Sequence, residues 1–152
     1  LVSKEIIANL LLGPSYISLD FALSFHGLIP ESVHEVTSIT TKRSKFFETV
    51  YGIFSYQQIK KELFNIGLKI QTSKSGNFII ASKEKALCDK VYFTKDIDLR
   101  SQKAMIEFLE DDLRIDIDEL DECDMSVFAK YFQISKSKKI DVLTKVIEGL
   151  RK

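Results

Sequence analysis

The sequence contains little cysteine and little histidine. Cys88 and Cys123 are its only cysteines among 152 residues, which is too few for a disulfide framework and gives no zinc-binding pattern. His26 and His34 are its only histidines, and they lack the spacing of a helical zinc site. Two isolated cysteines indicate a reducing compartment, so we expect a cytoplasmic protein. Because no metal-ligand pattern is present, we also expect that the protein holds no metal and no cofactor.

Long apolar runs and nucleotide-binding motifs are also missing. No apolar run approaches the roughly 20 residues that a membrane-spanning helix needs, and no signal peptide is visible. The sequence has neither a P-loop nor a dinucleotide-binding glycine motif. We therefore expect no membrane partner. With 45% hydrophobic residues, the chain can form one compact domain around its own core.

Net charge is absent as well, but the charges are unevenly distributed. Basic and acidic side chains number 22 each. Residues 107–124 hold ten acids and one base, Arg114, so the remaining chain has 21 bases and 12 acids. A neutral total therefore conceals an acidic segment within a basic protein. An acidic-faced protein-interaction module is one interpretation of this segment.

The first thirty residues predict two helices. Ser3 is a suitable N-cap for a helix that Gly13 ends. Ser18 is a suitable N-cap for a second helix over residues 19–26, which Gly27 ends. Apolar side chains fall on two sides of this second helix, with Phe21 and Phe25 forming one of the two stripes. This pattern predicts a buried helix that acts as a packing centre.

Strand signals dominate the middle of the chain. Residues 34–41 are rich in β-branched side chains and predict a strand. Residues 46–59 predict a hairpin that turns near residues 51–52, followed by a short helix. Residues 68–82 predict a second hairpin with its turn at residues 73–76.

Helices account for the rest of the sequence. Ser82 is a suitable N-cap for a helix over residues 83–93, on which Cys88 takes the place of a small apolar side chain. Further helices are predicted from Ser101, Asp124, and either Ser135 or Ser137. The order of elements predicts an α+β fold with an antiparallel sheet of two hairpins plus an extra strand, packed by N-terminal and C-terminal helices. We expect an α/β core over residues 1–93 and a helical part over residues 94–152.

Catalytic residues are sparse. His26 lies on the apolar side of its helix, which is typical of a structural histidine. Two pairs of acids, Asp96 with Asp98 and Asp116 with Asp118, could hold Mg²⁺ if they lay on a strand. The sequence lacks the Gly-Ser turn before a helix that nucleotidyl transferases need and the Glu-x-Lys tripeptide of many nucleases. We therefore expect that the protein is not an enzyme. The alternative is a metal-dependent nuclease or nucleotidyl transferase.

Clusters of basic residues are more informative. They follow the first full strand and the first hairpin, and they open the last helix, close to aromatic side chains in the first case. Basic side chains on loops beside aromatic residues suit contacts with nucleic-acid phosphates. The candidate DNA-binding residues are Lys42, Arg43, Lys45, Lys60 and Lys61, with Lys136, Lys138 and Lys139 as a further run and Phe46, Phe47 and Tyr56 as the neighbouring aromatics.

Four ordered motifs resemble the AbiEi antitoxin family. The matching runs are SYISLDFALSFHGLIPE, VHEVTSITTKRSKFFETVYGIFSY and FIIASKEKALCDKVYF, which contain the family patterns ending in Pro30, Arg43, Tyr56 and Asp89. The resemblance covers about residues 8–93, and extends only loosely into the helical part.

The resemblance implies a regulator from a bacterial abortive-infection (type IV toxin–antitoxin) system used in phage defence. Such a protein represses its own operon and opposes a nucleotidyltransferase-like toxin, without direct binding to the toxin being implied. The family normally has an N-terminal winged helix, which would precede Leu1. The chain then corresponds to the C-terminal antitoxin domain, and its expected partner is operator DNA, bound together with that winged helix.

Overall fold

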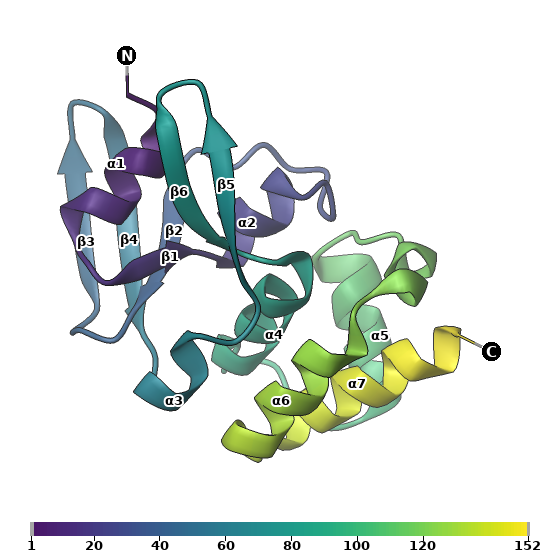
Figure 1. The fold of residues 1–152 in the computed structure, drawn as a ribbon. Coiled ribbons are helices and arrows are strands. Elements are labelled where there is room, and N and C mark those ends of the chain that lie inside the picture. Colours follow the sequence, from purple (N-terminus) through teal and green to yellow (C-terminus); the bar gives the residue numbers. More distant parts are fainter. Residues whose placement is uncertain (1, 152) are drawn as a thin grey trace.

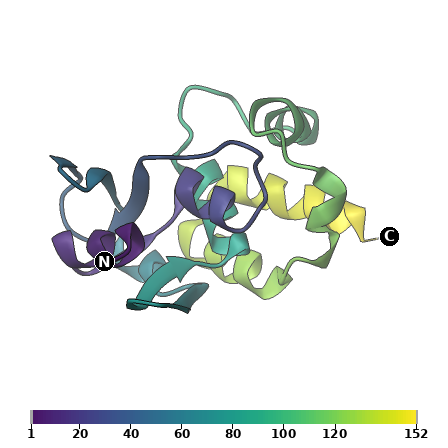
Figure 2. The same cartoon turned by 90° about the horizontal axis from the view of Figure 1, so that it is seen from above.

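The computed structural model of the chain describes residues 2–151. It is an α+β fold in which a six-stranded sheet lies beside a group of helices (Figures 1 and 2). The strands are β1 (Ser15–Ile17), β2 (Val36–Thr40), β3 (Lys45–Thr49), β4 (Gly52–Gln58), β5 (Leu68–Ser73) and β6 (Gly76–Ala81). The helices are α1 (Lys4–Leu11), α2 (Leu19–Phe25), α3 (Lys61–Phe64), α4 (Lys83–Phe93), α5 (Gln102–Glu107), α6 (Met125–Ser135) and α7 (Lys138–Leu150), with a π-helical turn η1 (Phe108–Asp112) and a 3₁₀ helix η2 (Ile117–Glu122).

The sheet is mixed, which corrects the prediction of an antiparallel sheet. Both predicted hairpins form, as β3–β4 and β5–β6, but the strand order is β3-β4-β2-β1-β6-β5. The pairs β2–β4 and β1–β6 are parallel. The strand β1 was not predicted, because three residues that are all buried show no alternation and run directly into a helix. This short strand joins the two halves of the sheet.

The predicted helix starts agree well with the structure. The side chains of Ser3, Ser82 and Ser101 each accept a hydrogen bond from a backbone N–H in the first turn of α1, α4 and α5. Asp124 does the same for α6. Ser18 stands at the N-cap of α2 but makes no such bond, because its hydroxyl is used elsewhere.

Helix α1 lies between the two hairpins (Figure 1). The side-chain amide of Asn9 accepts a hydrogen bond from Ile79 N (2.6 Å) and donates one to Ile79 O (3.3 Å). It therefore pairs with the backbone of β6 in the way that a neighbouring strand would. On the other side, the Tyr56 hydroxyl donates to the carbonyl of Ala8. The helix is thus tied to both halves of the sheet.

The helix α2 is less deeply buried than its sequence pattern predicts. Ala22 and Leu23 are fully buried, whereas Phe25 is 43% exposed and Phe21 is only partly buried. The ring of Phe25 packs edge-to-face on Phe78 of β6 at a centroid distance of 6.0 Å. The second apolar stripe therefore covers the edge of the core and does not form its centre.

A buried carboxylate connects the sheet to the helices. Asp89, on α4, is fully buried and accepts hydrogen bonds from Tyr16 Oη (2.9 Å), Ser18 Oγ (2.7 Å) and Tyr131 Oη (2.8 Å). Two of these donors lie at β1 and one lies on α6. A charge removed from water needs such partners, so Asp89 fixes where strand β1 and helix α6 meet α4.

Lys85 lies one turn before Asp89 and is also buried. Its ammonium group donates to the carbonyls of Leu63, Phe64 (3.2 Å) and Ile66 (2.8 Å) at the end of α3. It also lies 5.0 Å from the ring centroid of Tyr16. Burial raises the pKa of Asp89 and lowers the pKa of Lys85, while the charge of each opposes the shift of the other. Burial thus disfavours both charged forms, and the hydrogen bonds offset part of that penalty.

We predict that Asp89→Asn strongly destabilises the protein. The substitution leaves Lys85 without its buried counter-charge and places an amide N–H₂ among hydroxyl donors, so we expect a loss of about 3–5 kcal/mol. Urea unfolding measures this loss. Asp98→Asn, at an exposed carboxylate, is the control and should leave the unfolding midpoint nearly unchanged. Equal midpoints for the two variants would contradict the importance of the buried network.

A second prediction compares two neighbouring apolar residues of α2. Leu23→Ala removes a fully buried side chain, and we expect a loss of about 2–5 kcal/mol. Phe25→Ala should lose less than half as much, because the ring is 43% exposed. Guanidinium unfolding of both variants under the same conditions makes the comparison. A larger loss for Phe25→Ala would restore the buried helix that the sequence predicts.

Candidate nucleic-acid interface

The five candidate DNA-binding residues come together at one end of the sheet. Strands β2 and β4 are parallel, with Thr40 opposite Gln58, so both strands end at the same edge. The loop after β2 and the segment after β4 leave the sheet side by side. We call this surface the basic edge; it consists of Lys42, Arg43, Lys45, Lys60 and Lys61.

Hydrogen bonds hold the two segments of the basic edge together. Ile59 N donates to Thr40 O (2.8 Å) and continues the pairing of the two strands. The backbone N–H of Gln58 donates to Ser44 Oγ (2.9 Å), and its side-chain amide donates to Thr41 O (3.1 Å). The backbone that carries the cations is therefore fixed before any ligand binds, which lowers the entropy cost of binding.

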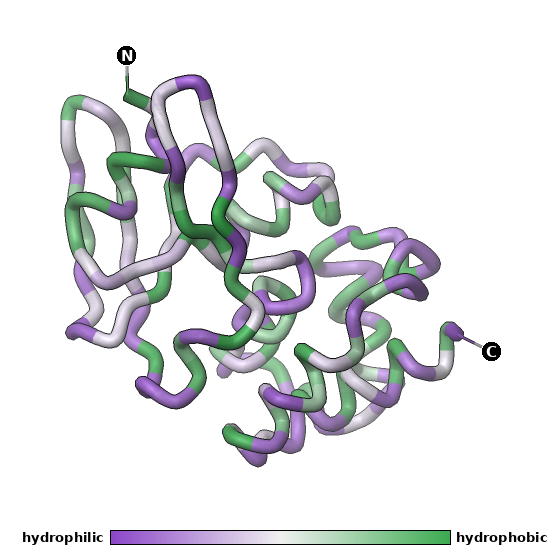
Figure 3. Tube along the Cα trace, viewed as in Figure 1, coloured by the Kyte–Doolittle hydropathy of each residue, from purple (hydrophilic) through white to green (hydrophobic). Residues whose placement is uncertain are grey.

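Thr40 anchors the start of the loop to the body of the protein. Its hydroxyl is buried, donates to Pro14 O (2.8 Å), and accepts from Lys42 N (3.2 Å). The Thr-x-Lys-Arg run thus places a structural threonine directly before two exposed cations. The loop carries no apolar side chain, and its tube runs from purple to near-white at the lower left of Figure 3.

The cations of the basic edge are available to a ligand. All five side chains are exposed, and none of them takes part in an ion pair among residues 2–151. Glu62 of α3 is the acid closest to them in sequence. Exposed lysine and arginine without a bound carboxylate are the usual contacts of a nucleic-acid backbone.

The neighbouring aromatic residues do not all face solvent. Phe46 is 62% exposed, but Tyr56 is only 3% exposed and packs on Phe47 at a centroid distance of 5.8 Å. Tyr56 therefore belongs to the core, and only Phe46 presents an open ring beside the cations. One open ring does not form a stacking platform for successive bases, so the chemistry of this edge points to phosphate contacts.

The basic edge and the start of the chain lie at opposite ends of the sheet. Residue 3 lies at the turn of the β5–β6 hairpin, where Ser3 N donates to Ser75 Oγ (3.2 Å). Figure 1 places both hairpin turns at the top and the β2–β3 loop at the bottom. Strand β4 has seven residues, so about 20 Å separate the two ends.

The paired acids do not come together to form a metal site. Asp98 accepts from Arg100 Nε (2.9 Å) and Nη2 (3.1 Å), and these bonds lower its pKa to about 2. Asp116 accepts from Asp118 N (3.3 Å) and caps η2. Within residues 2–151 no group of three or more histidine, cysteine, aspartate or glutamate side chains could hold a metal ion. The carboxylates of Asp98 and Asp116 thus each have a local structural partner.

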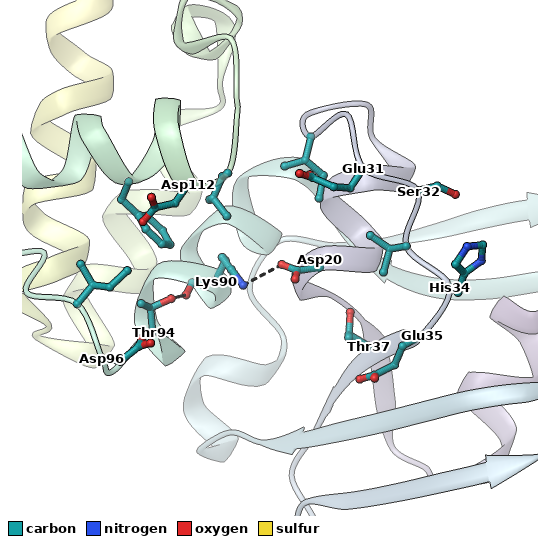
Figure 4. A pocket seen from close by; sticks show the side chains of 15 residues that line it. Asp20, Glu31, Ser32, His34, Glu35, Thr37, Lys90, Thr94, Asp96 and Asp112 are labelled. Atoms are coloured by element: carbon teal, nitrogen blue, oxygen red, sulfur yellow. Dashed lines mark hydrogen bonds and ion pairs between the residues drawn. The ribbon is translucent and has the colours of Figure 1, made fainter.

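A hollow of about 710 Å³ lies between the α2–β2 loop and the helices (Figure 4). Its walls carry carboxylates from both sides, among them Glu35, Asp96 and Asp112. Asp20 pairs with Lys90 at 2.9 Å, and Glu31 pairs with Arg114. His34 also lines this hollow. The acidic lining of this hollow disfavours phosphate, so the hollow differs from the basic edge in the ligands that it could bind.

The remaining candidate residues have structural surroundings. His26 is half-buried, and its Nε2 lies 2.8 Å from the carbonyl oxygen of Ala81. This contact agrees with the prediction of a structural histidine. Cys88 and Cys123 are buried free thiols, and burial raises the pKa of both. A raised thiol pKa is unfavourable for a nucleophile.

Sequence reasoning missed the buried pair Lys85 and Asp89. Both belong to the Glu-Lys-Ala-Leu-x-Asp motif, whose first residue, Glu84, accepts from Asp124 N (2.9 Å) at the start of α6. The available signal was a lysine and an aspartate four residues apart in a helix whose other inner positions, apart from Glu84, are apolar. The polar residues of this motif thus connect α4 to other elements of the fold.

Comparisons with known proteins do not identify the chain. No model of a protein family matches the sequence, and no curated protein matches it significantly. Among the helices within residues 2–151, none is both long enough and apolar enough to cross a membrane.

Proposed function

We propose that this chain is the antitoxin and autorepressor component of a bacterial type IV toxin–antitoxin system, and that it acts without catalysis. In this proposal the basic edge contacts the phosphates of operator DNA, assisting a winged helix that precedes the chain. The functionally linked partner is a nucleotidyltransferase-like toxin, which the protein opposes without necessarily binding it. The proposal rests on the resemblance to AbiEi antitoxins together with the basic edge.

One observation supports the proposal more than any other. The four motifs that carry the resemblance are separate runs of the sequence, and their residues contact one another. Strand pairing joins the second motif to the third, with Ser38 opposite Tyr56. Thr37 of the second motif donates to Ser18 O of the first (2.6 Å), and the Thr40 hydroxyl donates to Pro14 O. Asp89 of the fourth motif accepts from Ser18. The motifs therefore form one structural unit. The loop bearing Lys42 and Arg43 belongs to this unit and is exposed at its surface.

The basic edge suits contacts that are insensitive to base sequence. Its charges are exposed, its backbone is fixed, and it lacks a stack of open rings. Phosphate contacts fix the orientation of a protein on DNA, whereas base contacts select the sequence. The winged helix would then select the operator, and the basic edge would increase the affinity without adding sequence preference.

The first test replaces three cations of the basic edge. The triple variant Lys42→Gln, Arg43→Gln, Lys45→Gln should bind random duplex DNA more weakly. The slope of log K against log salt should fall by roughly 0.9 for each phosphate that the variant no longer neutralises. Fluorescence anisotropy over a salt series measures both quantities, for this chain and for the complete gene product.

The matched control is Lys69→Gln, Lys74→Gln, Lys130→Gln, which changes the charge equally at exposed positions outside the basic edge. If both triple variants lower the slope by the same amount, the basic edge has no special role. The complete gene product should lose affinity equally on operator and random DNA, because phosphate contacts do not identify bases.

The second test addresses the enzyme alternative. The double variant Asp96→Ala, Asp98→Ala should protect cells from the toxin as well as the unchanged protein does, because both carboxylates are exposed and one serves only Arg100. Cell survival during toxin expression is the measurement, with protein level and thermal midpoint as controls. Loss of protection by a normally folded, normally abundant variant would support a metal-dependent reaction.

A further inference from the structure

Lys139 is a half-buried cation without a carboxylate partner. Its ammonium group donates to the carbonyls of Tyr92 (3.0 Å) and Thr94 (2.6 Å) at the end of α4. No ion pair among residues 2–151 includes it. These two bonds cap a helix C-terminus and hold the charge in place. The ammonium retains a third N–H, which can donate to a ligand.

Other cations surround the same place. A hollow of about 560 Å³ is lined by Lys95, Arg100, Lys138 and Lys139. Asp96 and Asp98 also line it, but Asp98 is engaged by Arg100 through two hydrogen bonds. Three lysines from the α4–α5 loop and the start of α7 then face one remaining carboxylate, Asp96, so the lining keeps an excess of positive charge.

Lys138 shares its carboxylate partner with a second lysine. Asp141 Oδ2 lies 3.8 Å from Lys138 Nζ and 3.1 Å from Lys145 Nζ, so its closer partner is Lys145. Burial lowers the pKa of Lys139, and the nearby positive charge of Lys95 lowers it further. The first residues of α7 add the positive end of a thirteen-residue helix. An anion in the hollow would offset these positive charges.

We propose that this hollow is a second phosphate-binding site. Lys95 and Lys138 contact the oxygens of one phosphate group, and Lys139 donates its third N–H to the same group. The ligand is a phosphate ester, either a phosphate of the nucleic-acid backbone or the phosphate of a free nucleotide. None of the five residues of the basic edge takes part, so this site can be tested separately from the basic edge.

The decisive variant is Lys95→Gln, Lys138→Gln, which leaves the structural contacts of Lys139 intact. The matched control is Lys69→Gln, Lys74→Gln on the β5–β6 hairpin, with the same change in charge at exposed positions. Inorganic phosphate and a 5′-nucleoside monophosphate are titrated at constant ionic strength and followed by amide NMR shifts. Binding of a random duplex is measured over a salt series in parallel.

If the site takes a free phosphate ester, amides of residues 94–100 and 137–140 shift and saturate. The affinity should then fall at least tenfold in the Lys95/Lys138 variant and less than twofold in the control. If the site takes the nucleic-acid backbone, the salt slope for the duplex should fall by roughly 0.9 in the variant, because the two lysines neutralise one phosphate. In that case the control should change the slope by less than half as much.

The proposal is overturned if phosphate and nucleotide produce no saturable shifts in these segments and the two variants bind the duplex alike. If the double variant loses thermal stability, Lys138→Gln alone decides the question, because that side chain is 60% exposed. Its effect on the affinity and on the salt slope should have the same direction and be no larger than that of the double variant.

Discussion

The burial of one carboxylate, Asp89, constrains the rest of the structure. A charge in the interior is unfavourable unless other groups satisfy it, and here the donors come from strand β1 and helix α6. Satisfying Asp89 therefore brings together residues that lie far from it in sequence on either side. Lys85 extends the same arrangement to the end of α3, where its ammonium meets three carbonyls. The sheet and the helices meet at this group of hydrogen bonds.

The basic edge depends on this arrangement through β1. Strand β1 pairs antiparallel with β2, and the residues that flank it, Pro14 and Ser18, bond to Thr40 and Thr37. These contacts set the position at which β2 ends and the Lys42–Arg43 loop begins. A change at the buried carboxylate would therefore reach the exposed cations in three steps. The first runs from Asp89 to β1, the second from β1 to β2, and the third from Thr40 to the loop. This connection gives a physical reason for the motifs to occur together.

Local patterns predicted the hairpins, the strand β2 and most helix starts, because turns and N-caps are encoded within a few residues. The strand β1 and the parallel pairs could not be read in this way, since they depend on residues brought together by the fold. The same holds for the site. The sequence indicated Lys42, Arg43 and Lys45 in one cluster and Lys60 and Lys61 in another, and only the parallel pairing of β2 with β4 joins them. Tyr56 was grouped with these cations, yet its hydroxyl bonds to Ala8 and its ring belongs to the core.

The separation of charge in this molecule affects how it would approach a polyanion. The acidic residues 107–124 lie in the helical part, and the basic edge lies at the far end of the sheet (Figure 1). A protein with zero net charge experiences no overall pull toward DNA, but a dipole experiences a torque that turns its positive end forward. Salt limits this torque to distances near the Debye length, about 8 Å at physiological ionic strength. The charge pattern would therefore select the orientation of the final encounter, and would leave the frequency of distant encounters to diffusion alone.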